Sequence, residues 1–227
     1  MSRKIKLILI FIIFIIGIVI LMFPFITNYL YQEKVKSIEY NYKEIIGLQN
    51  NFDSLNELLK NKNEMLFLNK QDSFINQKVS FEKIEFDLSE YGLSDNIIGF
   101  VSIPSIDIKL PIYLGASIKN MNKGAVHLTG TSYPIGGINT NSVIAAHRAY
   151  SKAKMFRDID KINIGDYLYI ENYNGILKYT AIKKEIINPN DFDKLKIVEG
   201  KDLVTIISCH PYRSSKKRYV VYFERVI

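Results

Sequence analysis

The 227-residue chain contains one cysteine and three histidines. A single cysteine excludes an internal disulfide bond. Zinc sites usually need several cysteine or histidine ligands, and His127, His147 and His210 are not at ligand spacing. We therefore predict no metal site. The lone thiol, Cys209, must serve another purpose, either as a small buried hydrophobe or as a reactive group.

Acidic residues are absent from a long apolar run near the N-terminus, residues 7–26, which only Gly17 and Pro24 interrupt. About 20 apolar residues are enough to cross a bilayer as a helix. A cleavable secretory signal is the alternative, but its apolar region is typically about 7–15 residues and ends in a small-residue cleavage site. No such site follows Phe23. We predict an uncleaved signal anchor over residues 7–26, with residues 1–6 in the cytoplasm.

A stripe of one charge sign is also missing. The formal charge of +7 comes from 30 basic and 23 acidic residues, and three of the basic ones, Arg3, Lys4 and Lys6, precede the apolar run. The other basic residues alternate with acids, as in Lys183-Lys184-Glu185. This pattern does not indicate a nucleic-acid surface and is typical of a solvated face. Lysines also follow the apolar run, so the charge bias gives only weak information on orientation.

Two segments with different residue patterns follow the apolar run. Apolar residues recur at steps of three and four between about residues 33 and 60, which predicts an amphipathic helix that packs on the domain or forms a stalk. A dimerising coiled coil is the alternative, but Gln49 lies on the apolar stripe. Residues 61–95 are polar and read as a loop or short helices, so residues 27–95 form a helical stalk and linker.

Short apolar runs divided by glycine and proline begin near residue 96 and continue to residue 227, which predicts a mainly β barrel or sandwich. Short helices are expected over Ala153–Ile162 and Pro189–Leu195. The expected strands are Ile97–Ile103, Ile106–Tyr113, Ser142–Ala146, Tyr167–Tyr173, Ile176–Ile186, Leu203–Ser208 and Arg218–Val226.

Three chemically distinct side chains stand at ends of these runs. Cys209 follows one apolar run, His147 follows another, and Arg218 opens the last. A thiolate nucleophile, a proton carrier and an oxyanion stabiliser are the groups that acyl transfer through a thioester requires. Each residue also has a structural reading: a core thiol, a satisfied histidine and a charge at a strand edge.

The other two histidines and Arg148 are less suited to chemistry. His127 lies in a strand-like segment without a partner, and we take it as structural. His210 is a rival base, but neighbours on a strand point to opposite faces, which counts against it. Arg148 is typical of a surface or salt-bridge residue.

The sequence around these residues resembles the sortases, the membrane-anchored cysteine transpeptidases of Gram-positive bacteria. Thr205-Ile206-Ile207-Ser208-Cys209 is similar to their Thr-Leu-x-Thr-Cys motif, Ala146-His147-Arg148 to their histidine segment, and Arg218 stands where their arginine stands. The similarity extends over about residues 97–227. Its central blocks, such as Ala153-Lys154-Met155-Phe156 and residues 130–137, look most like class C, the pilin-polymerising sortases.

The resemblance implies a closed barrel of about eight strands with short helices over residues 96–227. It also implies cleavage of an LPxTG-like sorting signal between Thr and Gly by Cys209, with His147 as proton donor. Arg218, with backbone groups near Ser208, would position the substrate or its oxyanion. The acyl group would pass to an amine: a pilin lysine in class C, or a peptidoglycan precursor in a housekeeping sortase. No cofactor is implied, and the catalytic domain would lie outside the cell on a single membrane pass.

The sequence departs from class C in several places, among them His210-Pro211-Tyr212 where class C commonly has Thr-Pro-Tyr, so the subclass stays open. Members commonly carry a C-terminal second span, which this sequence does not contain, and a lid with Asp-Pro-aromatic. Asp72-Ser73-Phe74 is the nearest lid candidate, and an ordinary loop is the alternative. Two other readings of the whole chain remain: a thiol hydrolase, and a membrane-tethered binding module without catalysis.

Overall fold

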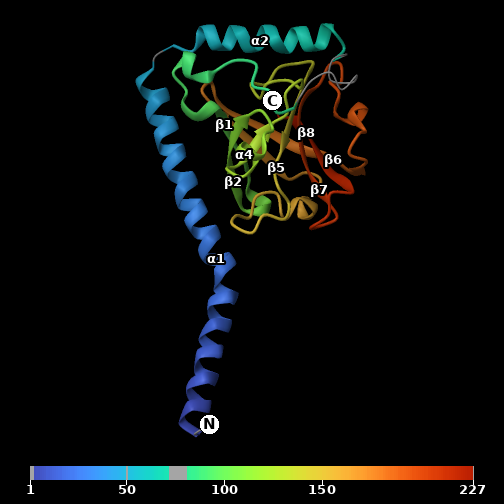
Figure 1. Ribbon diagram of the computed structural model, residues 1–227. Helices are drawn as coiled ribbons and strands as arrows, with labels where there is room; N and C mark the ends of the chain where they lie inside the picture. The colour runs from blue at the N-terminus through green and yellow to red at the C-terminus, as the bar shows by residue number, and fades with distance from the viewer. Residues whose placement is uncertain (1–2, 50, 72–80, 227) are drawn as a thin grey trace.

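The protein consists of a long N-terminal helix, a second helix and a β-barrel (Figure 1). The computed structural model describes residues 3–49, 51–71 and 81–226. The first helix projects from the barrel as a rod, and the second lies across the opposite end of the barrel.

Eight strands close into one barrel in the order β1-β2-β3-β4-β7-β8-β6-β5, which confirms the predicted mainly β fold. The strand bounds are β1 Ile97–Ile103, β2 Ile108–Leu114, β3 Ala125–His127, β4 Thr140–Ala145, β5 Tyr167–Asn172, β6 Gly175–Ile187, β7 Asp202–His210 and β8 Lys217–Arg225. Closure removes the exposed edges that an open sheet of this size would leave.

Side chains alternate between the two faces of each strand, and this separates two apolar clusters. Val204 and Ile206 of β7 belong to the main core, together with Val221 and Phe223 of β8. Ile207 on β7 belongs instead to a second cluster that also contains Val220 and Tyr222. The barrel interior and an outer apolar patch are therefore built from the same two strands.

Two strand pairs are parallel, β2 with β3 and β4 with β7. Parallel neighbours need a crossover connection, because the chain must return to the starting end. Residues 115–124, with the short helix α4 (Ile118–Met121), make the first crossover, and residues 188–201, with η5 (Phe192–Leu195), lead from β6 to β7. Both crossovers run on the outside of the barrel and frame the second apolar cluster.

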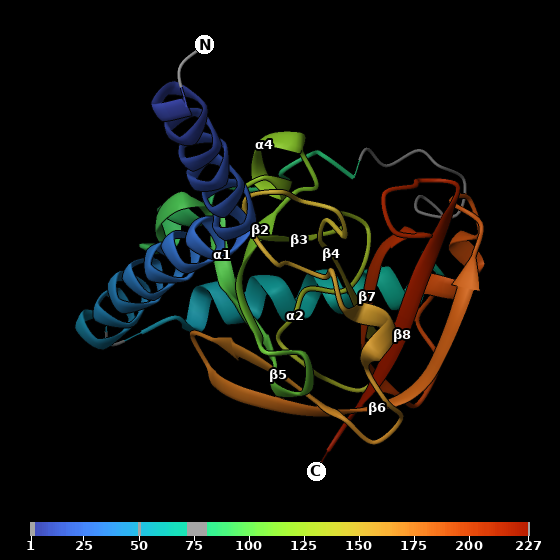
Figure 2. The same cartoon turned by 90° about the horizontal axis from the view of Figure 1, so that it is seen from below.

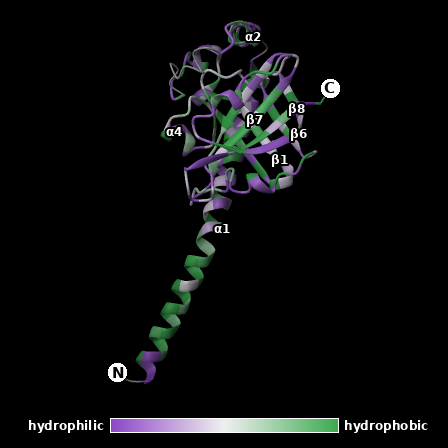
Figure 3. Ribbon diagram, turned by 90° about the vertical axis from the view of Figure 1, so that its right-hand side faces the viewer, coloured by the Kyte–Doolittle hydropathy of each residue, from purple (hydrophilic) through white to green (hydrophobic). Residues whose placement is uncertain are grey.

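Helix α1 (Arg3–Leu48) is continuous from the apolar run to the barrel. Its first half is exposed and apolar, as the green part of the rod in Figure 3 shows, and it is long and apolar enough to cross a membrane. Its second half docks on the barrel: Val35 and Tyr42 are buried, and the Tyr42 hydroxyl donates to the carbonyl oxygen of Ile98 at 3.0 Å.

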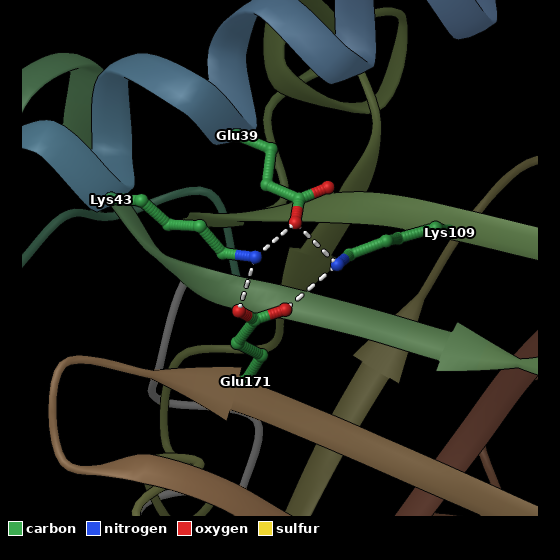
Figure 4. Close-up of polar contacts among 4 residues, drawn as sticks. All are labelled: Glu39, Lys43, Lys109 and Glu171. Atoms are coloured by element: carbon green, nitrogen blue, oxygen red, sulfur yellow. Dashed lines mark hydrogen bonds and ion pairs between the residues drawn. The ribbon is translucent and has the colours of Figure 1, made fainter.

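A closed ring of four charges fastens α1 to the barrel (Figure 4). Lys109 on β2 contacts Glu39 and Glu171 at 2.7 Å each, and Lys43 contacts Glu171 at 2.9 Å and Glu39 at 2.5 Å. Glu39 and Lys43 lie on α1, whereas Glu171 lies on β5. Each charge meets two of opposite sign, so the ring joins three elements.

The helical stalk differs from the single helix expected between about residues 33 and 60. Helix α1 ends at Leu48, and helix α2 (Asp53–Leu68) starts five residues later in a new direction (Figure 2). The Asn51 side chain accepts from the backbone N–H of Asp53 at 2.6 Å, which begins α2 separately. Leu55 and Leu59 are fully buried, and burial of α2 against the barrel explains the turn.

The two expected short helices are also shorter than predicted. Only η4 (Ile159–Lys161) forms within Ala153–Ile162, because Met155 has a φ of 42°, which a right-handed helix does not allow. Within Pro189–Leu195 only η5 forms. In the linker, the short 3₁₀ turns η1 (Leu88–Tyr91) and η2 (Ser94–Asn96) precede β1. A further turn, η3 (Pro104–Ile106), joins β1 to β2 and moves the start of β2 from the expected Ile106 to Ile108.

One end of the barrel lies directly beside the start of the docked part of α1. The Thr27 hydroxyl donates to the carbonyl oxygen of Ser151 at 3.4 Å, and the Asn28 side chain accepts from the Lys154 N–H at 3.0 Å. Tyr31 donates to the carbonyl oxygen of Lys123 at 3.0 Å. These contacts begin within one helical turn of Ile26, so this end of the barrel sits next to the apolar run.

Candidate active site

Cys209 and Arg218 face each other across two antiparallel strands. Cys209 is the penultimate residue of β7, Arg218 is the second residue of β8, and the two are register partners. Directly opposed residues of an antiparallel pair lie about 4.5–5.5 Å apart at Cβ. Two residues nine positions apart in the sequence are therefore direct neighbours across the sheet.

Both residues line a groove of about 580 Å³ on the outer face of β4 and β7. Odd-numbered positions of β7 face this groove, and Ile207 and Cys209 follow one another along it. Its walls are mainly apolar and come from both crossovers and from the segment before the barrel: Phe81, Ala116, Met121, Leu128, Ala145, Phe192, Leu195 and Ile207. The groove suits an extended peptide with apolar side chains, and the thiol lies at one end of it.

His147 lies at the same end of the barrel as Cys209. Ala145 of β4 pairs with Ile207 of β7 in a parallel register, so two further residues along each strand lead to His147 and Cys209. The strands stay together as far as Ala146, whose N–H donates to the carbonyl oxygen of Ile207 at 3.4 Å. The imidazole ring itself lies beside the groove wall.

The surroundings of the imidazole keep it neutral. Its Nε2 donates to the Asn122 side-chain oxygen at 3.2 Å, next to Met121 of the groove wall. The ring stacks on Tyr150 with centroids 5.5 Å apart. Partial burial lowers the pKa of His147 below its ordinary value, since removing water disfavours the charged form.

Ser208, the candidate for substrate positioning, lines the groove but is committed elsewhere. Its side chain is buried, and its hydroxyl donates to the carbonyl oxygen of Ala146 at 2.7 Å. This bond ties β7 to the residue before His147. Through its side chain, Ser208 therefore connects the two strand ends that carry the thiol and the imidazole.

The guanidinium of Arg218 is held by the loop that precedes it. Nη1 donates to the carbonyl oxygens of Ser215 at 2.8 Å and Lys217 at 3.0 Å. Both bonds leave donors of the planar fork free, since arginine carries five N–H groups. A fixed cation with free donors next to a thiol can stabilise negative charge on an oxygen atom bound there.

Sequence reasoning missed the contacts of Arg148. Its side chain is only 4% exposed, although arginine at such a position is usually on the surface. It forms an ion pair with Asp160 at 2.6 Å, as expected for a salt-bridge residue, but it also donates to Nδ1 of His210 at 2.8 Å. The only local signal was that each of the two residues directly follows a candidate catalytic residue, and their contact depends on the register of β4 and β7.

The remaining histidine, His127, is a core residue. Its ring is buried, its Nε2 donates to the carbonyl oxygen of Ser132 at 3.0 Å, and it stacks on Tyr133. Burial lowers its pKa to about 4. Within residues 3–49, 51–71 and 81–226, no group of three or more His, Cys, Asp or Glu side chains could hold a metal ion.

A segment before the barrel covers part of the groove. The carbonyl oxygen of Phe81 accepts from the Ala116 N–H at 2.6 Å, and that of Lys83 accepts from the Thr129 hydroxyl at 2.6 Å. The Phe81 and Phe192 rings lie 5.4 Å apart over the groove wall. The expected lid residues, Asp72 and Phe74, lie just before this segment and outside the described residues.

Comparison with known proteins begins with two curated relatives. The chain is 32% identical over 127 residues to Sortase A of Bacillus anthracis, covering 55% of this chain and 58% of that protein. It is 28% identical over 131 residues to Sortase D of Bacillus subtilis, covering 56% and 63%. The chain thus spans about three fifths of the length of these relatives.

Solved structures extend the likeness beyond the barrel. Sortase C1 of Group B Streptococcus (Pilus Island 1) is 28% identical, with a TM-score of 0.68 over 85% of this chain and 92% of that one. Sortase C-1 of Streptococcus pneumoniae is 31% identical, with a TM-score of 0.66 over 83% and 97%. Both are class C sortases, and the resemblance of the central blocks to class C is confirmed.

The family match covers the strands and loops that carry the site. The sortase domain model matches residues 101–226, which include His147, Cys209 and Arg218. This is more than half of the chain and nearly the whole barrel. The chain therefore belongs to the sortase family.

Proposed function

We propose that the protein is a transpeptidase that cleaves an LPxTG-like sorting signal between Thr and Gly and transfers the acyl part to an amine. One observation carries this proposal: Cys209 and Arg218 are register partners at the end of an apolar groove, and the adjacent parallel strand leads to His147. Nucleophile, oxyanion stabiliser and proton carrier are thus available at one strand end.

The chemistry follows from the protonation states. The Cys209 thiolate attacks the threonine carbonyl carbon, and the oxyanion that forms accepts hydrogen bonds from Arg218. The C–N bond then breaks, and the glycine amine leaves with a proton from His147. Partial burial lowers the pKa of His147 and favours the neutral imidazole, which takes this proton from the thiol before the attack.

The second half reverses these steps. An incoming amine attacks the thioester carbonyl and loses a proton to His147, and the C–S bond breaks to regenerate the thiolate. Water in place of the amine gives a carboxylic acid. The exclusion of water by an apolar, partly covered groove therefore favours transfer over hydrolysis.

For the acceptor amine, we propose a pilin lysine. The class C structures support this choice, and Phe81 and Glu82, which precede the barrel, line the groove. One of the solved relatives is described as a lid mutant of Streptococcus agalactiae Sortase C1. The curated relatives named Sortase A favour a second candidate, an amine of a peptidoglycan precursor.

For the location, we propose that residues 7–26 cross the cell membrane once and that the barrel lies outside. The length and apolar character of the exposed half of α1 support this topology. Secreted proteins that carry sorting signals would then meet the groove on the outer surface. The barrel end that bears Cys209, His147 and Arg218 is the end beside Thr27 and Asn28.

The direct test is mass spectrometry of the protein incubated with LPxTG-like peptides, with and without an added amine. We expect an amide product with amine and slow acid formation without it, and no product from Cys209→Ala. Acid alone under both conditions would make the protein a hydrolase. Binding of the peptide without turnover by the wild type would favour a binding module.

A further inference from the structure

The residues that directly follow His147, Cys209 and Arg218 in sequence also meet one another. They are Arg148, His210 and Tyr219. The Arg148 Nη1 donates to His210 Nδ1 at 2.8 Å, the Arg148 guanidinium lies 5.7 Å from the Tyr219 ring centroid, and the His210 and Tyr219 rings are 5.7 Å apart. With Asp160, the ion-pair partner of Arg148, we name these residues the inner cluster.

Strand alternation explains why a second group forms behind the first. Consecutive residues of a strand point to opposite faces. Cys209 and Arg218 point to the outer groove, so His210 and Tyr219 point to the barrel interior, where Tyr219 packs against the main core. The inner cluster therefore occupies the end of the barrel behind the site, and each of its three strand-end members shares a peptide unit with a candidate catalytic residue.

Arg148 connects all the other members. Its Nη2 pairs with Asp160 of η4 at 2.6 Å, its Nε donates to the carbonyl oxygen of Arg157 at 3.4 Å, and its Nη1 donates to His210. A cation this buried is costly unless it is paired and hydrogen-bonded, and here both conditions are met. A lysine has a single nitrogen and cannot reproduce this fork.

The contact with Arg148 fixes the state of His210. Guanidinium groups only donate hydrogen bonds, so Nδ1 of His210 must accept and its proton must lie on Nε2. Protonation of Nδ1 would replace this bond by two cations 2.8 Å apart. The groups that face His210 are Arg148 from the β4–β5 connection and Asp160 beyond it, and from β8 Tyr219 and Lys217, the register partner of His210.

We propose that Arg148 is a positioning residue for the reaction, which holds the ends of β4, β7 and β8 together through neutral His210 and through Tyr219. The proposal rests on the proposed function of Cys209, His147 and Arg218. A shift of any one strand end would move the catalytic side chain on the next residue, and a displacement of about 1 Å can cost on the order of 10²-fold in rate.

The test compares variants of the full chain in detergent. Arg148→Met removes every donor while keeping an unbranched apolar stem. His210→Asn keeps an acceptor oxygen near the Nδ1 position, whereas His210→Leu removes the acceptor. Asp160→Asn weakens the anchor of Arg148 at a side chain that is 47% exposed, so this variant is expected to fold even if Arg148→Met does not.

Turnover of the sorting peptide is the first readout. We expect kcat to fall on the order of 10²-fold in Arg148→Met and His210→Leu, with KM within about threefold, because binding in the groove is kept and alignment is lost. Asp160→Asn should show a smaller loss of the same kind. His210→Asn should stay within about threefold of the wild type.

The second readout is the pH profile of Cys209 alkylation by iodoacetamide, followed by intact mass. With one thiol in the chain, each adduct reports on this atom. In Arg148→Met and His210→Leu the profile should shift away from that of the wild type, whereas in His210→Asn it should match the wild type. Residues that only stabilise the fold would shift the thermal midpoint and leave this profile unchanged.

The outcomes separate the two proposals. Folded Arg148→Met and Asp160→Asn with wild-type kcat and wild-type alkylation profiles would overturn the positioning role. Equal loss in His210→Asn and His210→Leu would also overturn it, because the imidazole itself would then be required. If the wild type cleaves no peptide, the proposed function fails, while the alkylation profiles still decide whether the inner cluster controls the thiol.

Discussion

At the scale of single residues, the proposed role of Arg218 predicts that its planar shape matters more than its charge. Its Nη1 is already bound by two loop carbonyls, so only the geometry of the remaining donors can serve an oxyanion. We expect Arg218→Lys to lower kcat/KM on the order of 10²-fold, since a point charge cannot occupy both sites. Arg213→Lys, in the same loop, is the matched control, and equal activity of the two variants would remove Arg218 from the site.

His127 makes acid stability testable at one residue. Burial lowers its pKa from 6.5 to about 4, so the unfolded chain binds a proton in this interval and the folded chain does not. The free energy of unfolding should therefore fall as pH drops from 6.5 to 4, by about 3 kcal/mol from this group. His127→Gln, which still donates but does not titrate, should flatten this part of the curve in urea unfolding measurements. A curve as steep as that of the wild type would contradict the assignment.

How much of the site the sequence predicts depends on what each residue contacts. Strand ends and motif spacing are local properties, so the sequence could propose Cys209, His147 and Arg218 as one site, and their roles stay a prediction. The pairing of Arg148 with His210 spans 62 positions and depends on the relative register of β4 and β7, which no local pattern encodes. Likewise, the groove walls come from crossovers whose paths follow from barrel closure.

At the scale of elements, the segment before the barrel should control access to the thiol. Phe81 lines the groove and its ring contacts that of Phe192. We expect Phe81→Ala to raise the rate of Cys209 alkylation several-fold and to increase the share of acid over amide product, because the groove becomes wetter. The measurement is intact mass over time at fixed reagent. An unchanged rate would mean that this segment does not limit access.

The ring of Glu39, Lys43, Lys109 and Glu171 is the electrostatic contact between α1 and the barrel. Burial acts to raise the pKa of both carboxyl groups, but hydrogen bonds from Lys109 and Lys43 outweigh it and hold both below the ordinary value. This stabilisation is present above the unfolded pKa and is lost as pH falls through the folded pKa. Lys109→Met should therefore cost about 1–2 kcal/mol at pH 7 and less in acid or high salt.

Urea unfolding at two pH values checks this prediction, and Lys152→Met, an exposed lysine outside the ring, is the control. A loss that is the same at pH 7 and in acid would show that the packing of the lysine stem, rather than its charge, matters.

Strands were more predictable than helices in this chain. Each expected strand is present in the structure, because glycine and proline mark the ends of its apolar run. The η3 turn only delays the start of β2 by two residues. The helix expected near residues 33–60 is instead two helices, α1 and α2, although the apolar stripe continues from one to the other. A 3.6-residue periodicity of apolar residues does not reveal where a helix ends and the chain changes direction.

At the scale of the whole molecule, α1 contains both the candidate membrane span and part of the folded domain. Removal of residues 1–26 should leave the thermal midpoint unchanged, because no described side chain of this stretch is buried. Removal of residues 1–48 should destabilise the barrel by on the order of 3–5 kcal/mol, since it exposes the surface that Val35 and Tyr42 cover. Thermal unfolding of both fragments measures this, and equal midpoints would mean that the docked half is dispensable.

Helix α1 is unbroken, and its contacts with the barrel start at Thr27 and Asn28, directly after the apolar run. The apolar run and the barrel are therefore joined by helix and not by a flexible linker. Once residues 7–26 are in a bilayer, the domain turns and drifts only as its helix does. A partner held in the same leaflet is then found by lateral diffusion across a plane, and encounter rates depend on copies per unit of area, not on concentration in the surrounding fluid.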